Sequence, residues 1–180
     1  MVKLNLGCGK RDFGSDWIHI DGADYPHLVS QNIESLDYRD KSVDLIYASH
    51  VIEYFDRFEV RALLKEWHRA LKPGGTLRLA VPNFSVLSKL YLTGKMKLKN
   101  VLGPLYGRMP MGPEIIYHKT VYDLEDLTLL LTECEFHDIK EYEWRETEHA
   151  EFDDHSQAYF PHMDKENGVL ISLNVECKKI

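Results

Sequence analysis

The stretch that decides the fold is Leu4-Asn5-Leu6-Gly7-Cys8-Gly9, a short apolar strand that runs directly into a glycine turn. Two glycines one residue apart let the backbone adopt positive φ angles and approach a ligand without a Cβ in the way. At the carboxyl end of a first parallel strand, such a turn lies where open α/β sheets bind ligands. Asp21 follows a second apolar stretch, residues 17–20, and is placed to accept hydrogen bonds from the two hydroxyls of a ribose. We therefore expect a nucleoside-type cofactor between the Gly7–Gly9 turn and Asp21.

The composition is that of a soluble globular domain with a reducing, cytoplasmic location. A length of 180 residues predicts one domain, and it is enough to bury a core without disulfides. The net charge of −7 argues against a general phosphate-backbone binder, so we expect no nucleic-acid partner. The three cysteines are widely spaced and contain no C-x-x-C pair, which argues against a disulfide framework or a zinc ribbon. The first strand begins by Leu4, which leaves no room for a signal peptide, and no apolar run approaches the ~20 residues of a membrane span. We therefore expect no membrane partner.

Apolar runs and turn residues predict the elements around the glycine turn. Strands are expected at residues 2–6, 17–20, 27–31, 43–48, 76–81, 137–145 and 169–178. One helix is expected over residues 58–71, ended by Pro73 and Gly74, and a second after the N-cap residue Asp123, with Leu124, Leu127, Leu130 and Leu131 on its buried face. Only residues 10–16 connect the first two strands, fewer than a parallel crossover with a helix needs. The order of elements indicates a three-layer α/β domain with a final antiparallel pair, in which the first crossover helix is shortened or absent.

Residues 84–118 are the least regular part of the chain, because they mix Gly, Pro, Met, Tyr and Lys without a clear period. They are interpreted either as a solvated helix and a loop or as a cap over the ligand site that selects the acceptor. The chain shows no internal repeat. We therefore expect a single domain over residues 1–180, with residues 84–118 as a variable insertion or cap segment.

Taken together, these landmarks resemble the class I S-adenosylmethionine-dependent methyltransferases, and especially their small type 11-like members. Residues 4–9 are similar to the first motif of that family, an apolar strand ending in Leu-Gly-x-Gly, and Asp21 stands at the position of its ribose-binding acid. Residues 44–54 are similar to its fourth-strand segment, and residues 71–77 to its Leu-Lys-Pro-Gly-Gly turn. The resemblance covers residues 3–83 well and residues 120–145 loosely.

The resemblance implies a Rossmann-like methyltransferase fold, with a mostly parallel sheet and an antiparallel C-terminal strand. It also implies S-adenosyl-L-methionine as cofactor and direct in-line transfer of its methyl group to a small or medium acceptor molecule. The sulfonium is already activated, so the protein mainly supplies positioning. A base is needed only where the acceptor must lose a proton, and no metal is required.

The resemblance also implies which residues form the site. Residues expected to bind the cofactor are Leu6, Gly7, Cys8 and Gly9 beside its methionine part, Asp21 at the ribose, Asn32 and Ile33 at the adenine, and Ser49 and His50 at the mouth of the pocket. Asn32 stands where the family often has an Asp, and its amide oxygen is expected to accept a bond from the adenine amine. His50 and His118 are the candidate catalytic residues, and each has a structural role as its alternative. The acidic, His-rich residues 153–162 lack a recognised metal-ligand spacing, so no metal site is expected.

Three departures from the family pattern keep an alternative open. Asn5 replaces the usual acid of the first motif, Arg11 replaces a third glycine, and the first crossover helix is missing. They motivate a non-catalytic S-adenosylmethionine-binding or regulatory module of the same fold. A nicotinamide-dependent oxidoreductase is disfavoured, because Asp12 stands where the Gly-x-Gly-x-x-Gly fingerprint requires glycine. The pattern determines neither the acceptor nor the oligomeric state.

Overall fold

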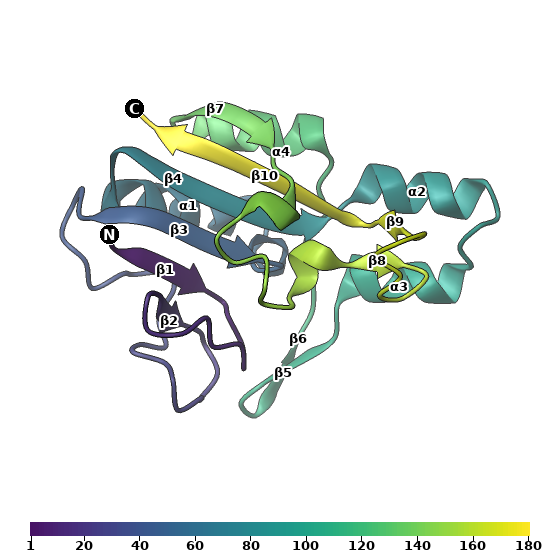
Figure 1. Cartoon of the computed structure of the whole chain (residues 1–180), viewed down its shortest axis with the longest axis horizontal. Helices are drawn as coiled ribbons and strands as arrows, with labels where there is room; N and C mark the ends of the chain where they lie inside the picture. The colour runs from purple at the N-terminus through teal and green to yellow at the C-terminus, as the bar shows by residue number, and fades with distance from the viewer.

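The computed structural model describes residues 1–180, and a six-stranded sheet lies at its centre (Figure 1). The strands are β1 (Lys3–Leu6), β2 (Ile18–Ile20), β3 (Val43–Ser49), β4 (Leu71–Pro82), β7 (Phe136–Glu141) and β10 (Ser172–Lys179), in the order β2-β1-β3-β4-β10-β7. Strands β2, β1, β3 and β4 pair in parallel, whereas β10 is antiparallel to both of its neighbours. The predicted mostly parallel sheet with an antiparallel C-terminal strand is confirmed.

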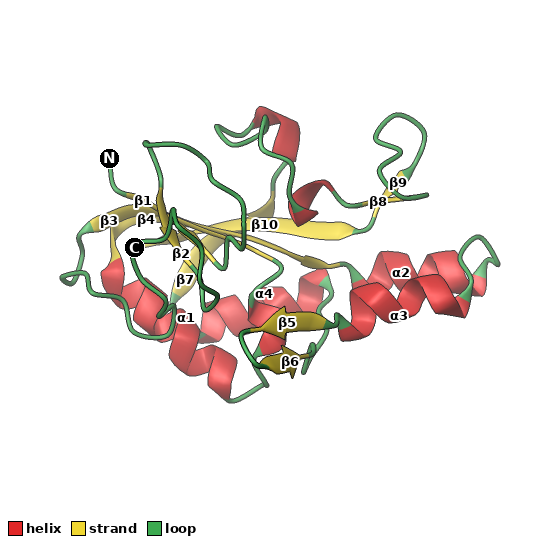
Figure 2. Cartoon of the chain, turned by 90° about the horizontal axis from the view of Figure 1, so that it is seen from below, coloured by secondary structure: helices red, strands yellow, loops and turns green.

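Helices cover one face of the sheet (Figure 2). Helix α1 (Glu59–Ala70) and helix α4 (Leu124–Glu133) place their apolar stripes in the main core, with Trp67 and Leu127 fully buried. Asp123 caps α4 as predicted, because its side chain accepts a hydrogen bond from the backbone N–H of Asp126. Leu124 was expected on the buried face of this helix, but it lies in the first turn and keeps 40% of its surface exposed.

The opposite face of the sheet carries loops and 3₁₀ turns in place of a helical layer (Figure 2). Residues 7–17 connect β1 to β2 without a helix, as predicted, and Phe13 and Trp17 from this connection pack on Leu45 and Tyr47 of β3. Phe152 stacks on Phe13 with 4.6 Å between ring centroids. The 3₁₀ turns η2 (Trp144–Glu146) and η3 (His155–Gln157) complete this layer. Aromatic side chains therefore replace the missing crossover helix.

Three predicted elements differ from the structure. Residues 27–31 form no strand, and only Ser30 makes an isolated bridge to Ile20 of β2. The Pro-Gly-Gly turn expected before residue 76 is an irregularity inside β4, because Val43 pairs with Leu71 and Leu45 pairs with Thr76. The last strand is divided: β9 (Val169–Leu170) pairs with β8 (Tyr159–Phe160) in a small separate sheet, and β10 begins at Ser172.

Residues 84–118 contain two helices and two short strands beyond the carboxyl end of β4 (Figure 1). Helix α2 (Phe84–Leu92) and helix α3 (Leu98–Tyr106) form a hairpin, followed by strands β5 (Met109–Met111) and β6 (Glu114–Ile116). The two helices share a small core of their own, made of Leu87, Leu90, Met96 and Val101. The segment therefore folds as a unit attached to the end of the sheet.

No helix of this chain combines the length and the apolar character needed to cross a bilayer.

Candidate cofactor and acceptor site

The topology of the sheet places a crevice at the carboxyl end of β1. The chain leaves β1 for β2 on one side, and later crosses to β3 on the other side of β1. In an open α/β sheet, the crevice at such a switch point is where ligands bind. The 3₁₀ turn η1 (Ile52–Tyr54) directly follows β3 and forms one wall of this crevice.

The two glycines of the first turn have different physical roles. Both adopt positive φ angles, 67° at Gly7 and 58° at Gly9, which favour glycine. A Cβ on Gly7 would lie only 2.3 Å from Cγ2 of Val51, whereas a Cβ on Gly9 would meet no atom within 4 Å. The space that a side chain of residue 7 would need is therefore occupied by Val51. The space beside Gly9 is empty, so its backbone is open to a ligand.

Asp21 is held rigidly beside this turn. Its Oδ2 accepts a hydrogen bond of 2.7 Å from the backbone N–H of Gly9, and its Oδ1 accepts one of 2.8 Å from Ala23. The residue is only 4% exposed, yet it lines both cavities described below. Each carboxylate oxygen keeps a further lone pair, so Asp21 is able to accept bonds from two hydroxyls of a ligand.

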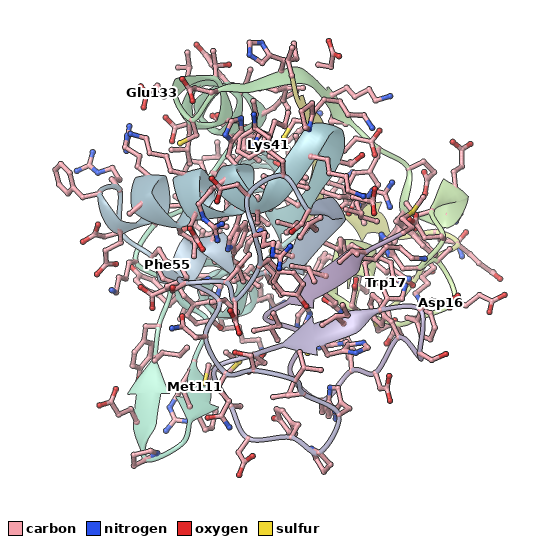
Figure 3. All side chains as sticks on the ribbon, turned by 90° about the vertical axis from the view of Figure 1, so that its left-hand side faces the viewer. Asp16, Trp17, Lys41, Phe55, Met111 and Glu133 are labelled. Atoms are coloured by element: carbon pink, nitrogen blue, oxygen red, sulfur yellow. The ribbon has the colours of Figure 1, made fainter.

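The smaller cavity, of about 230 Å³, lies where the adenine was expected. Asn32 and Ile33 line one side, and Phe55, Met111 and Ile116 line the others. Phe55 follows η1 and Met111 belongs to the β5–β6 hairpin, so segments far apart in the sequence line this cavity. Figure 3 labels both residues. Phe55 and the hairpin residues were not anticipated from the sequence, because no local pattern marks an apolar residue that faces a cavity.

The side-chain oxygen of Asn32 is already used within the protein. Oδ1 of Asn32 already accepts two backbone N–H groups, those of Glu34 at 3.0 Å and Ser35 at 2.9 Å. An amide oxygen has two lone pairs, so both are occupied. What Asn32 offers a ligand is the donor group Nδ2, which suits a ring nitrogen and not an amine.

The larger cavity, of about 740 Å³, adjoins the smaller one and shares Gly7, Asp21, His50 and Tyr54 with it. The predicted site residues that line it are Gly7, Gly9, Asp21, Ser49, His50 and His118. The side chains of Leu6 and Cys8 line neither cavity: Leu6 lies in the main core, and Cys8 is 4% exposed. Burial raises the pKa of Cys8 to about 12, which is consistent with a packing residue and not with a nucleophile.

A buried carboxyl group connects the two candidate histidines. Oε1 of Glu53 lies 3.5 Å from Nδ1 of His50 and 3.8 Å from Nε2 of His118, and neither carboxyl oxygen has a hydrogen-bond partner. Glu53 is fully buried, and this burial raises its pKa to about 8. Burial also lowers the pKa of His118. Burial, with a smaller contribution from the nearby His155, lowers the pKa of His50 well below its usual value. At neutral pH the cluster is therefore a protonated carboxyl between two uncharged imidazoles.

The hydrogen bonds at the edges of this cluster fix the protons of the two rings. Nδ1 of His118 lies 3.0 Å from the carbonyl oxygen of Pro104, which only accepts, so Nδ1 donates and Nε2 faces Glu53 with a free lone pair. Nε2 of His50 lies 3.5 Å from Oγ of Ser172, which itself donates to Asn174. His50 has a φ of 56°, a left-handed conformation that turns it away from the line of β3.

A glycine on the far side of the cavity allows His118 to reach the cluster. A Cβ on Gly107 would lie 2.1 Å from Nε2 of His118, so no other residue fits beside the ring without displacing it. Sequence reasoning did not find Gly107, Glu53 as the link, or the cavity residues Arg11 and Arg108. The only available signal was Arg11 at a position where the family has glycine.

The acidic, His-rich segment does not form a metal centre, since no group of three or more His, Cys, Asp or Glu side chains is placed to hold a metal ion. Asp154 instead accepts a short hydrogen bond of 2.5 Å from the hydroxyl of Tyr47, and caps η3 through the N–H of Ser156. His155 stacks against His50 with 5.0 Å between ring centroids.

The described residues fit an S-adenosylmethionine-type ligand. Gly9 leaves backbone open, Asp21 offers lone pairs, and the hydroxyl of Ser49 is buried with no partner in the protein. An apolar slot suited to a planar base adjoins them at Ile33 and Phe55. These features occur in the order in which the methionine, ribose and adenine parts follow one another.

Comparison with known proteins supports the same family. Residues 4–79 match the family model of the type 11 methyltransferase domain. No curated protein matches the chain in sequence.

Solved structures share the fold over the whole chain. A SAM-dependent methyltransferase from Methanosarcina mazei matches with a TM-score of 0.54 and 18% identity, covering 99% of this chain and 92% of that one. A possible histamine N-methyltransferase from Thermotoga maritima matches with a TM-score of 0.58 and 15% identity, over 99% and 82% of the two chains. The 1,6-didemethyltoxoflavin-N1-methyltransferase of Burkholderia thailandensis, solved with S-adenosylhomocysteine, matches with a TM-score of 0.57 and 13% identity, over 99% and 70%. S-adenosylmethionine is the cofactor that this family implies, as predicted. Residues 4–79 thus match a methyltransferase domain of type 11, and the whole chain has a Rossmann-like fold that it shares with solved S-adenosylmethionine-dependent methyltransferases.

Proposed function

We propose that this protein is an S-adenosylmethionine-dependent methyltransferase that acts by direct transfer on a small or medium acceptor held in the larger cavity. One observation carries the proposal: the crevice of Gly9 and Asp21 opens into a cavity of about 740 Å³ that contains His50 and His118. The cofactor supplies an activated methyl group on a sulfonium. The protein then has to hold that group and the acceptor in line.

The cofactor-binding roles follow from the geometry of the first turn. Asp21 accepts bonds from the ribose hydroxyls, and the amide of Asn32 donates to a ring nitrogen of the adenine. Arg11 lines the cavity just beyond Gly9, and its Nε is held by the carbonyl of Asp153 at 2.8 Å. Its remaining guanidinium donors suit the carboxylate of the methionine part.

His50 acts as the base, and Glu53 positions it. In the structure Ser172 donates to Asn174 and so accepts from Nε2–H of His50. When Glu53 is ionised it accepts a hydrogen bond from Nδ1–H of His50, so the ring changes to the Nδ1–H tautomer and Nε2 becomes free to take a proton from the acceptor. Because the pKa of Glu53 is raised to about 8, this form grows as the pH rises toward and above 8. His118 presents a free Nε2 to the same carboxyl and stays uncharged, because burial lowers its pKa; the proton that Glu53 releases as the pH rises goes to solvent.

This arrangement favours an acceptor that must lose a proton, such as a hydroxyl or a ring N–H. Two of the structural neighbours carry names of N-methyltransferases that act on small nitrogen compounds. An acceptor without a removable proton, such as a thioether, would not require a base next to the transfer site. We therefore place the acceptor among small molecules with an acidic O–H or N–H.

Calorimetry with S-adenosylmethionine and S-adenosylhomocysteine is the first test. We expect both to bind with one site per chain, and an absence of binding by either would refute the proposal. Incubation of acceptor pools with cofactor carrying a labelled methyl group then tests transfer. Tight binding with no labelled product from any pool would favour the non-catalytic module, which the replacement of the first-motif acid by Asn5 also suggests.

A further inference from the structure

The α2–α3 hairpin and the segment through β5 that follows it have a charge unlike that of the rest of the chain. Five of the 22 Lys and Arg residues lie within residues 84–113, whereas none of the 29 Asp and Glu residues do. The five are Lys89, Lys95, Lys97, Lys99 and Arg108, and none of them forms a salt bridge within the protein. Three of them, Lys95, Lys97 and Lys99, lie at the tip, where α2 passes into α3. A cationic tip therefore projects from a protein whose net charge is −7.

The same tip exposes large apolar side chains. Leu92 is 82% exposed and Leu98 is 56% exposed, and they stand at the end of α2 and the start of α3. Tyr91 and Leu102 beside them are also exposed. The hairpin does not need these side chains for its own core, which Met96 and Val101 fill. Figures 1 and 2 show the hairpin projecting from the end of the molecule opposite both chain termini.

We propose that the tip of the α2–α3 hairpin docks on the surface of an anionic lipid bilayer. Lysines interleaved with exposed leucines suit the interface, because the apolar side chains enter the acyl boundary while the ammonium groups remain among the headgroups. The acidic body is repelled by an anionic surface and the tip is attracted, so the charge pattern selects one orientation. Such docking requires no membrane span, but it departs from the expectation of no membrane partner, which rested on the absence of a span.

Exposed leucines favour a bilayer over a nucleic acid as the occupant. A single-stranded nucleic acid would be held by aromatic or Arg side chains that stack on bases. At the tip only Tyr91 offers a ring, and the most exposed side chain is the aliphatic Leu92.

Docking at the tip would place the acceptor cavity near the bilayer. The far end of α3 lines that cavity through Gly103, Pro104 and Gly107. A helix of nine residues is about 13 Å long at 1.5 Å per residue. An amphiphilic acceptor with its polar part raised above the headgroups would therefore reach the site. This last consequence rests on the proposed methyltransferase function, whereas the docking itself does not.

Vesicle flotation of the full chain tests the docking. At 0.1 M salt, where the Debye length is about 10 Å, we expect the protein to float with vesicles of phosphatidylglycerol and phosphatidylcholine. It should stay in solution with vesicles of phosphatidylcholine alone. The combined variant Lys95→Glu, Lys97→Glu and Lys99→Glu should lose at least about tenfold in bound fraction, since each lysine contributes to attraction at the surface. The matched control, Arg39→Glu, Arg57→Glu and Lys65→Glu, makes the same change in net charge on the body at exposed positions and should bind within about twofold of the wild type.

A second variant separates docking from simple electrostatic adsorption. The double variant Leu92→Ser and Leu98→Ser leaves the net charge unchanged and replaces only exposed side chains. It should therefore keep the wild-type melting temperature and still lose about tenfold in flotation. The proposal would be overturned if this variant floated as well as the wild type. It would also be overturned if the tip and body charge variants lost equal bound fractions. Absence of flotation by the wild type, or tighter binding to homopolymer RNA than to vesicles at the same salt, would also overturn it. Calorimetry with S-adenosylhomocysteine on the same variants reports the cofactor site independently.

Discussion

The two sides of the ligand cavity are built in different ways. The cofactor side comes from the Gly7–Gly9 turn and Asp21, which are joined by a direct hydrogen bond between neighbouring strand ends. The acceptor side brings Glu53 into contact with His118 and Gly107, which the chain places more than fifty residues later. The first is a local arrangement that short sequence motifs describe. The second exists only because residues 84–118 fold back over the end of the sheet.

This difference suggests that variants on the two sides will fail in different ways. Changes on the cofactor side should alter stability and cofactor affinity, whereas changes on the acceptor side should alter turnover with affinity unchanged.

The largest effect is expected for His50→Ala. Removal of the base should slow methyl transfer roughly 10²- to 10⁴-fold, the usual range for general base catalysis. Binding of S-adenosylhomocysteine should remain within about threefold of the wild type, because His50 only borders the cofactor crevice. Single-turnover transfer and calorimetry on the same preparation measure the two quantities. A variant that transfers at full speed would assign His50 a structural role.

Gly7→Ala should destabilise the cofactor side by roughly 2–5 kcal/mol. The new Cβ would meet Val51 at 2.3 Å in a left-handed backbone, so overpacking and backbone strain add. Urea unfolding measures the loss. The matched control is Gly14→Ala, which has a φ of 79° but no atom within 4 Å of the new Cβ, and should lose only about 1–2 kcal/mol from strain. Equal losses in the two variants would mean that contact with Val51 has no part in the effect.

Asp21→Ala should weaken cofactor binding by roughly 1–3 kcal/mol, the cost of losing hydrogen bonds to a charged group. Asp21 also holds the N–H of Gly9, so its removal frees the turn as well as the ribose. Calorimetry with S-adenosylhomocysteine measures the change. Unchanged affinity would show that the ribose binds elsewhere and that Asp21 serves the turn alone.

The smallest effect is a pH dependence of stability that Glu53→Gln should remove. The folded pKa of Glu53 is raised to about 8, so the folded state keeps a proton that the unfolded chain releases above its ordinary value of 4.5. This stabilisation is complete below pH 4.5 and is lost as the pH rises through 8, with a slope of up to about 1.4 kcal/mol per pH unit. The lowered histidine pKa values act below pH 6.5, so the window from 6.5 to 8 isolates Glu53.

Urea unfolding of wild type and Glu53→Gln across that window gives the comparison. The wild type should lose stability relative to the variant as the pH rises. Parallel curves would contradict a protonated carboxyl at this position.

The sequence anticipated the local geometry of the first turn well and the contacts within the larger cavity poorly. The Gly-x-Gly turn, Asp21 and the missing crossover helix depend on chain geometry within a few residues, and each was found at its expected place. The sequence did not reveal that the Asn32 oxygen accepts two backbone N–H groups of the turn that follows it. His118 was named as a candidate, but its carboxyl partner and the glycine that admits it were not.

By itself, the sequence determined an α/β sheet with a glycine turn at the end of its first strand, where it also predicts a nucleoside site. It could do so because apolar periodicity, glycine conformations and the short residue 10–16 connection are local constraints. Only the tertiary structure decided which groups share the acceptor cavity and that Glu53 keeps its proton at neutral pH. The physical reason is that the burial of a side chain and its distance to other groups depend on the whole fold. Here they depend on the hairpin segments and η1 lining the same cavity, and burial is what raises the pKa of Glu53.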